Sequence, residues 1–340
     1  MAVPVMRRMG LPLIVLLLFT LSGASVPTQA APSDPWRSVA AAVSRVAPDV
    51  SFIVAEAEGG DCRTLASVAG DERLGVASTF KLYVLGALAR QVAAGDADWD
   101  EQIAVSSRWK SKASGAMRYE TDGTRHSLRY FAERMMAESD NTATDHLIAR
   151  LGRENVEATQ SVLGHGAPEM NTPFLLTREL FALKLTDDAA LIDRYLRASE
   201  DDQRAFLDQS IGPVRLAPEG WGTWSGPRWV DQIEWFASAT DLCRAWARLD
   251  QMADHPKLTP LDSIMAINDG RDLFRRPTWT YAAFKEGYES GVYSMSWLLH
   301  RADGRAFVLV AIYNDSATDV KSESAWLIAR AAAPILAKTP

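Results

Sequence analysis

The sequence predicts an α+β fold in which one five-stranded antiparallel sheet, flanked by helices, carries an inserted and mainly helical lobe. Three observations lead to this prediction. Strand-like segments occur near both ends of the chain, the region between them has helical periodicity, and a helix-like segment lies beside each group of strands. Strands separated in this way pair most simply in a single sheet that the terminal helices cover.

The individual elements follow in order along the chain. Residues 35–46 have the pattern of an amphipathic helix, and residues 51–57 and 63–68 that of strands joined across the Gly59-Gly60 turn. A long, mainly helical stretch then extends to about residue 276. The C-terminal elements are predicted as strands at 281–284, 292–301 and 306–313, followed by a helix at 320–336.

Residues 1–30 have the pattern of a signal peptide. Arg7 and Arg8 precede an apolar core at 11–21, and Thr28-Gln29-Ala30 fits a small-residue cleavage site. The apolar core is short for a membrane span, and an uncleaved N-terminal anchor is the alternative. We therefore expect a secreted or periplasmic protein with no stable membrane anchor once the signal is cleaved.

Removal of the leader leaves residues 31–340, which are enough for two lobes that share a cleft. We assign about 32–77 and 277–340 to an α/β lobe and about 78–276 to a helical lobe. The formal charge of the full chain is −7 and becomes more negative without the two leader arginines. This charge argues against nucleic acid or anionic membranes as partners.

The most informative motif is Ser78-Thr79-Phe80-Lys81, which opens a helix that is apolar on nearly every face. Ser78 and Lys81 lie one turn apart on the same side of such a helix, so the ammonium group lies beside the hydroxyl. Burial lowers the pKa of a lysine toward that of a useful base. The motif therefore predicts a nucleophilic serine that needs no histidine.

Two further motifs follow, Ser139-Asp140-Asn141 within a predicted helix and Lys285-Glu286-Gly287 next to the predicted C-terminal strands. In this order the three motifs resemble those of the penicillin-recognising serine enzymes, most closely the class A β-lactamases. Ser114-Gly115 and Asn171-Thr172-Pro173 lie where that family has similar residues. The resemblance covers most of the chain after the leader and implies a β-lactamase/transpeptidase-like fold.

The resemblance implies roles for the residues that carry the chemistry. Ser78 is the implied nucleophile and Lys81 a candidate base, although the group that activates the serine is disputed in this family. Ser139 would pass a proton to the leaving nitrogen or oxygen.

Four other residues are implied in substrate binding. Asn141 would hold the substrate amide and Lys81, and Lys285 would hold Ser139 and an anionic substrate group. The backbone N–H groups of Ser78 and Tyr288, with Gly287 beside them, would form the oxyanion hole. Each such donor typically contributes about 3 to 4 kcal/mol of transition-state stabilisation.

Each motif also has an ordinary structural interpretation. Ser78 is also a suitable helix N-cap, the Ser139-Asp140-Asn141 segment a polar break with local hydrogen bonds, and Lys285 a charge that protects a strand edge. The ordered combination of all three favours the catalytic interpretation.

The first departure from the family concerns the water that hydrolyses the acyl-enzyme. Class A β-lactamases carry a glutamate for this purpose in a long loop, whereas the corresponding segment here, 142–172, is short. Glu169 is a weak candidate base within it; an exposed turn or a helix cap is the competing interpretation. Slow deacylation, or activation of the water by Lys81, would follow.

The second departure is Glu286, where the family usually has a threonine that helps to bind the substrate carboxylate. Strand alternation would turn Glu286 away from the cleft and leave Lys285 and Gly287 facing it. Ser290 or Ser294 would then be candidates for the missing hydroxyl.

A Trp-rich insert at 220–235 follows the helix predicted at 176–185. It could cover the cleft, stack on a sugar, face a partner, or simply pack its own aromatic side chains. The insert and the short loop resemble a subgroup of β-lactamase-like serine hydrolases.

Cys62 lies near the predicted hairpin and Cys243 on a predicted helix. An oxidising compartment would permit one disulfide, but the sequence leaves bonded and free cysteines equally open. The five histidines show no His-Glu-x-x-His pattern, and no Gly-x-Ser-x-Gly elbow occurs, so we predict no metal and no cofactor.

The leading prediction is an exported serine hydrolase that forms an acyl-enzyme at Ser78 and acts on a small-molecule β-lactam, amide or ester. A penicillin-binding protein or esterase with slow deacylation is the near alternative. The distant alternative is a non-catalytic module that binds peptidoglycan or an antibiotic. The sequence leaves the physiological substrate and the oligomeric state open.

Overall fold

The computed structural model describes residue 1 and residues 34–214 and 225–340. The predicted signal peptide and residues 220–224 of the Trp-rich insert therefore lie outside the described residues. Residues 35–340 form one compact unit. Within the described part of the chain, no helix has the length and apolar character needed to cross a membrane.

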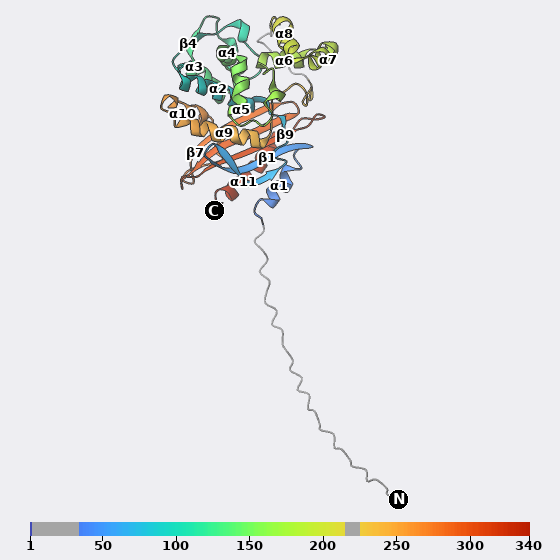
Figure 1. The fold of residues 1–340 in the computed structure, drawn as a ribbon, viewed down its shortest axis with the longest axis vertical. Helices are drawn as coiled ribbons and strands as arrows, with labels where there is room; N and C mark the ends of the chain where they lie inside the picture. Colours follow the sequence, from blue (N-terminus) through green and yellow to red (C-terminus); the bar gives the residue numbers. More distant parts are fainter. Residues whose placement is uncertain (2–33, 215–224) are drawn as a thin grey trace. The chain divides into compact units, whose positions relative to one another are not determined.

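A five-stranded antiparallel sheet forms the centre of this unit (Figure 1). Its strands are β1 (Asp49–Glu58), β2 (Asp61–Val68), β7 (Trp279–Glu289), β8 (Val292–Arg301) and β9 (Ala306–Asn314). They lie in the order β2-β1-β9-β8-β7, so the N-terminal hairpin pairs with the last strand. The predicted sheet is confirmed, with one correction. The strand expected at 281–284 extends through Lys285 and Gly287, because the whole of β7 pairs with β8.

Each face of the sheet is covered by helices. The helices α1 (Arg37–Val43) and α11 (Ser322–Leu336) pack on one face, where Val39, Phe52 and Trp326 belong to a single apolar cluster. The opposite face packs against α9 (Ala239–Ala253) and α2 (Lys81–Ala94), and its apolar cluster includes Ile53. The interior strand β8 is buried along almost its whole length because both faces of the sheet are covered.

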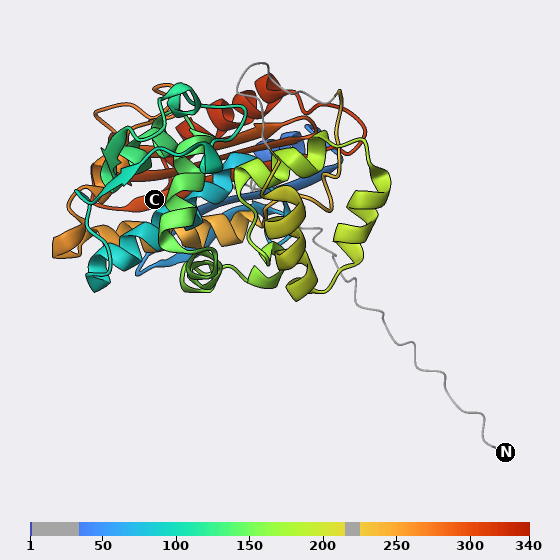
Figure 2. The same cartoon turned by 90° about the horizontal axis from the view of Figure 1, so that it is seen from above.

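The helical lobe lies on the α2 side of the sheet (Figure 2). Its helices are α3 (Leu128–Ala137), α4 (Asn141–Leu151), α5 (Arg153–Val162), α6 (Thr177–Leu185), α7 (Ala189–Arg197), α8 (Glu200–Phe206) and α10 (Leu261–Met265). Short strands connect its segments: β3 (Leu74–Gly75) pairs with β6 (Phe236–Ala237), and β4 (Gln102–Ala104) with β5 (Arg125–Ser127).

Local sequence signals set several boundaries of these elements. Gly59 and Gly60 both have positive φ and turn the chain between β1 and β2. Gly95, with φ of 88°, ends α2 in the left-handed conformation. Ser238 and Asp241 form a capping box at the start of α9.

Cys62 and Cys243 form a disulfide that joins β2 to α9. The sequence separation of the two cysteines is 181 residues, so the bond closes a loop that contains most of the helical lobe. The sequence left open whether the two cysteines are bonded or free, and in the structure they are bonded.

Candidate active site

Ser78 and Lys81 lie at the junction of a short 3₁₀ turn, η1 (Ala77–Phe80), and α2. The Lys81 Nζ donates a hydrogen bond to Ser78 Oγ over 3.1 Å. Ser78 is half-buried, whereas Lys81 is fully buried. The predicted pairing of the two side chains is therefore present in the structure.

Lys81 is surrounded by neutral oxygen atoms. Its Nζ donates to Asn141 Oδ1 at 2.6 Å and to the backbone oxygen and Oγ of Ser139 at 2.6 and 3.0 Å. Burial lowers the pKa of Lys81 well below its ordinary value, and the nearby positive charge of Lys285 lowers it further. A lysine in this state can accept the proton of a neighbouring hydroxyl.

Ser139 lies between two helices and not within one helix as predicted. Its φ of 56° is in the left-handed region, and the helix ends at Ala137 before a new one begins at Asn141. Asp140 caps the second helix, because its carboxylate accepts hydrogen bonds from the N–H groups of Ala143 and Met117. This break turns the Ser139 hydroxyl toward the two lysines.

Lys285 approaches Ser139 from the sheet. Its Nζ donates to Ser139 Oγ at 3.0 Å, the same distance as that between Ser139 Oγ and Lys81 Nζ. Burial lowers the pKa of Lys285 to about 8. One hydroxyl therefore lies between two amines that are easier to deprotonate than an exposed lysine, an arrangement that can move a proton.

Gly287 permits the edge strand β7 to approach the Ser78 turn closely. A Cβ atom at this position would lie 2.3 Å from the backbone oxygen of Val76 and 2.6 Å from the backbone nitrogen of Ser78. Only glycine allows this approach without a shift of the backbone. Tyr288, the next residue, is exposed and lines the same cavity as Ser78.

The cavity at Ser78 has a volume of about 450 Å³. The sequence-predicted residues Ser78, Ser139, Asn141 and Tyr288 line it, whereas Lys81 and Lys285 lie behind them. Sequence reasoning missed several other lining residues: Thr177, Leu180, Phe181, Trp235, Arg271, Glu289 and Tyr293. Trp235 belongs to the Trp-rich insert and stacks on Phe80, with ring centroids 3.7 Å apart. Among these missed residues, Trp235 alone had a signal in the sequence, because the Trp-rich insert was one candidate to cover the cleft.

Strand alternation predicts that Glu286 turns away from the cleft, and this prediction is wrong, because Glu286 lines the Ser78 cavity. The Tyr293 hydroxyl, which lines the same cavity, donates to Glu286 Oε2 at 3.1 Å. The two candidate replacement hydroxyls are used elsewhere. Ser294 Oγ donates to the backbone oxygen of Val76 at 2.6 Å, and Ser290 bonds to Asp319.

Glu169 is not brought to the site. It lies on the short turn η4 (Pro168–Asn171), is exposed, and does not line the Ser78 cavity. The helix α6 provides the wall of the cavity through Thr177, Leu180 and Phe181.

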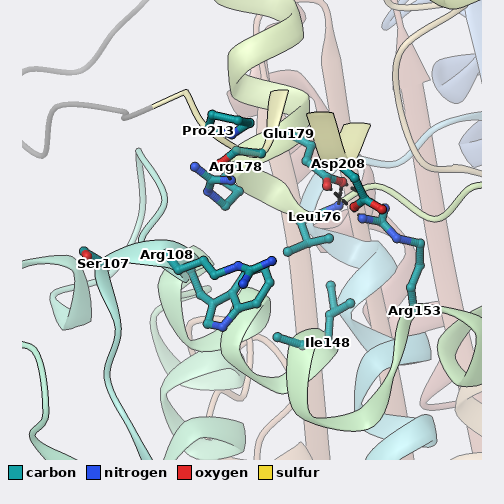
Figure 3. Close-up of a pocket in the computed structure, with 12 residues that line it drawn as sticks. Ser107, Arg108, Ile148, Arg153, Leu176, Arg178, Glu179, Asp208 and Pro213 are labelled. Carbon is teal, nitrogen blue, oxygen red and sulfur yellow. Dashed lines mark hydrogen bonds and ion pairs between the residues drawn. The ribbon is translucent and has the colours of Figure 1, made fainter. Parts of the chain in front are cut away.

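A second cavity, of about 480 Å³, lies on the other side of the start of α6 (Figure 3). Figure 3 shows Ile148 and Leu176 between the side chains of Arg108 and Arg153. Arg153 is paired with Glu179 at 2.7 Å, and Arg178 donates to the backbone oxygen of Gly212 at 3.0 Å. These arginines brace the lobe, and the Ser78 cavity is the one that combines a hydroxyl with amines of lowered pKa.

Comparisons with known proteins agree with this geometry. The model of the Beta-lactamase enzyme family matches residues 35–338. A search of curated proteins finds no significant match.

Solved structures show the same fold. A β-lactamase from Sphaerobacter thermophilus DSM 20745 is 22% identical, with a TM-score of 0.61 over 90% of this chain and 99% of that one. The structure of PBP-A is 16% identical, with a TM-score of 0.61 over 91% and 97% of the two chains. A mutant of PBP-A, also 16% identical, is an acyl-enzyme complex with penicillin G, with a TM-score of 0.60 over 92% and 100%. The match over residues 35–338, together with the shared fold, places this chain in the Beta-lactamase enzyme family.

Proposed function

We propose that the chain is an exported serine hydrolase that forms an acyl-enzyme at Ser78 and acts on a β-lactam, an amide or an ester. The observation that carries this proposal is the 3.1 Å hydrogen bond between Lys81 Nζ and Ser78 Oγ, beside a cavity that a substrate can enter. Burial lowers the pKa of Lys81, so its neutral amine is accessible at lower pH than that of an exposed lysine.

Acylation would proceed in three proton transfers. Neutral Lys81 takes the Ser78 proton as Oγ bonds to the substrate carbonyl carbon, and the backbone N–H groups of Ser78 and Tyr288 stabilise the resulting oxyanion. Ser139 then gives its proton to the leaving nitrogen or oxygen as the scissile bond breaks. Lys81 or Lys285, each 3.0 Å from Ser139 Oγ, returns a proton to it.

Charges of both signs surround the cavity. Arg271 lines it and the buried amine of Lys285 lies behind Ser139, whereas Glu138, Glu286 and Glu289 also line it. Arg271 and Lys285 are the candidates for binding an anionic group such as the carboxylate of a β-lactam, in keeping with the family of the chain.

Deacylation is the step that distinguishes a β-lactamase from a penicillin-binding protein or an esterase with a long-lived acyl-enzyme. Glu169, the weak candidate base, is exposed and does not line the cavity. Lys81 is then our candidate for activating the water, and we expect slow turnover.

Export is supported by the signal-peptide pattern and by the Cys62–Cys243 disulfide, since such bonds persist in oxidising compartments. Fractionation of expressing cells, with sequencing of the mature N-terminus, tests this part of the proposal. An N-terminus at Met1 or a cytoplasmic location would contradict it.

The catalytic proposal is tested by mass spectrometry of the protein incubated with a penicillin and with a cephalosporin. We expect wild type, but not Ser78→Ala, to gain the mass of each drug, and the adduct to decay slowly. Rapid decay with product release would indicate a true β-lactamase. Binding without an adduct, equal in wild type and Ser78→Ala, would favour the non-catalytic binding module.

A further inference from the structure

A second group of buried charges lies next to the Ser78 turn, and the mechanism above does not use it. We call Lys184, Glu234 and Glu289 the Lys184 cluster. Lys184 Nζ lies 3.1 Å from Glu234 Oε1 and also pairs with Glu289. The side chains of Lys184 and Glu234 are fully buried, and that of Glu289 is 11% exposed, at the wall of the Ser78 cavity.

The cluster is joined to the nucleophile segment by a hydrogen bond from a backbone N–H to the Glu234 carboxylate. Glu234 Oε2 accepts from the N–H of Ala77 at 3.2 Å and from its neighbour Trp235 at 3.0 Å. Ala77, which directly precedes Ser78, has a φ of 43°. This left-handed conformation is unfavourable for a residue other than glycine and persists only where its surroundings hold it.

The flanking residues show how the segment is held. The N–H of Val76 donates to the backbone oxygen of Trp235 at 2.9 Å, and Ser294 Oγ donates to the backbone oxygen of Val76 at 2.6 Å. Val76 is thus held on both of its backbone polar groups, and Glu234 holds the next N–H along the chain. Rotation about φ at Ala77 would carry the backbone nitrogen of Ser78 with it.

Stability alone is a poor explanation for this cluster. Removing charged groups from water is costly, and their mutual attraction in the interior often only balances that cost. An apolar set of similar volume would fill the same space at least as well. Strained backbone held by such a group occurs preferentially at functional sites.

We propose that Glu234, itself oriented by Lys184 and Glu289, is a positioning residue that holds the Ala77–Ser78 peptide so that the N–H of Ser78 points into the cavity. The inference rests on the proposed acylation of Ser78. It assigns the Lys184 cluster a part in catalysis through the backbone, without contact between the cluster and the substrate.

The test compares Glu234→Gln with a double variant and a matched control. In Glu234→Gln the amide oxygen can accept from the Ala77 N–H only if the amide NH₂ group points toward the Lys184 ammonium. Both of these groups are hydrogen-bond donors, so this orientation is unfavourable. In Lys184→Met/Glu234→Gln the ammonium is gone, and the amide oxygen can face Ala77. The control is Asp241→Asn, because buried Asp241 also accepts two backbone N–H bonds, from Ser238 and Gly166, and pairs with Arg73.

The measurements are the acylation rate constant and the half-saturating concentration, obtained from the burst of p-nitrophenol with p-nitrophenyl acetate and from adduct formation with penicillin G. Rates are expressed per folded molecule, with folding checked by circular dichroism. For Glu234→Gln we expect the rate constant to fall about 10- to 100-fold, as misplacement by about 1 Å does, with little change in half-saturation. The double variant should recover most of this loss, and Asp241→Asn should acylate like wild type.

Equal acylation rates in wild type and Glu234→Gln would overturn the inference, as would a loss no greater than that in Asp241→Asn. Failure of the double variant to recover would also count against it, since a merely structural cluster predicts further loss. If wild type itself is not acylated by either probe, the proposed function fails, and this result is recognisable before any variant is compared.

Discussion

Two lysines of this protein are equally buried, and yet their pKa values are shifted in opposite directions from that of an ordinary lysine. Lys81 and Lys184 both have no exposed surface. Burial lowers the pKa of Lys81 well below its ordinary value, and no carboxylate accepts a hydrogen bond from it among the described residues. Burial also acts to lower the pKa of Lys184, but the charges of Glu234 and Glu289 outweigh it and raise that pKa. The partners of a buried amine, more than its burial, therefore decide its protonation.

The difference matches two different tasks. Lys81 is surrounded by neutral oxygens and can lose its proton, as the proposed base must. Lys184 is held as a cation between two carboxylates and can orient Glu234. The local sequences, Phe80-Lys81-Leu82 and Leu183-Lys184-Leu185, look alike, so neither predicts the behaviour of its lysine.

The largest effect is expected at Lys81. Lys81→Arg keeps the positive charge but cannot supply a neutral base, because arginine stays protonated in proteins. We expect acylation of Ser78 to fall by about 10²- to 10⁴-fold, the usual contribution of a general base. Burst kinetics with an active ester measure this loss, and a wild-type rate would show that Lys81 is not the base.

Lys184→Met should lower the stability of the folded protein. It removes the cation that pairs with Glu234 and Glu289, and breaking a buried ion pair in this way typically costs about 3–5 kcal/mol. Because pairing raises the pKa of Lys184 above the unfolded value of about 10.4, its stabilisation is fully present at pH 7 and is lost only as the pH rises through the folded pKa.

Urea unfolding at pH 7 measures this cost. Lys110→Met is the control, because Lys110 forms a partly exposed ion pair with Asp122 at 2.8 Å and such pairs contribute about 0–1 kcal/mol. Equal losses in the two variants would contradict the distinction between the buried lysines.

Removing the disulfide should lower the stability of the protein without changing the environment of Lys81 or Lys184. The Cys62–Cys243 bond closes a loop of 181 residues, and loss of a native disulfide typically costs about 2–5 kcal/mol. We expect the double variant Cys62→Ser/Cys243→Ser to unfold at lower temperature and to acylate normally per folded molecule. A large loss of acylation in well-folded variant protein would show that α9 influences the site.

The pH dependence of acylation tests the cause of the lowered pKa of Lys81. The base is the neutral amine, so acylation should rise with pH through the pKa of Lys81, which lies below that of an ordinary lysine. Lys285→Met removes a positive charge that lowers this pKa, and the acid limb of the profile should move to higher pH. The measurement is the pH at which acylation reaches half of its maximum on the acid side, and not the maximal rate. An unchanged or lower position would show that the two amines are not coupled.

The smallest effect is expected at Glu169. It is exposed and does not line the cavity. We expect Glu169→Gln to leave the decay rate of the penicillin adduct within about twofold of wild type, as for a typical surface change. Strong accumulation of the adduct in this variant would instead restore Glu169 as the base of deacylation.

Much of the site could be predicted because its motifs are local. Ser78 and Lys81 are one helical turn apart and hydrogen-bond to each other. Alternation along β7 was a weaker guide, because Glu286 lines the cavity that it was expected to face away from. The sequence offered a polar break at Ser139 only as the alternative to a helix. It could not decide between them, because the Asp140 carboxylate that caps α4 also accepts a hydrogen bond from Met117, 23 positions earlier in the chain. Ser294 was a reasonable candidate for the cleft until the fold placed its hydroxyl on Val76.

The sequence by itself determined the strands and helices of the sheet, the order of the three motifs and the identity of the amines near Ser78. Hydrophobic periodicity and helical spacing depend on residues a few positions apart, so the sequence alone shows them. Only the tertiary structure decided the disulfide, the wall formed by α6 and the pairing of Lys184 with carboxylates 50 and 105 positions away. The physical reason is that burial and charge pairing depend on which distant segments meet, and this is set by the packing of the whole chain.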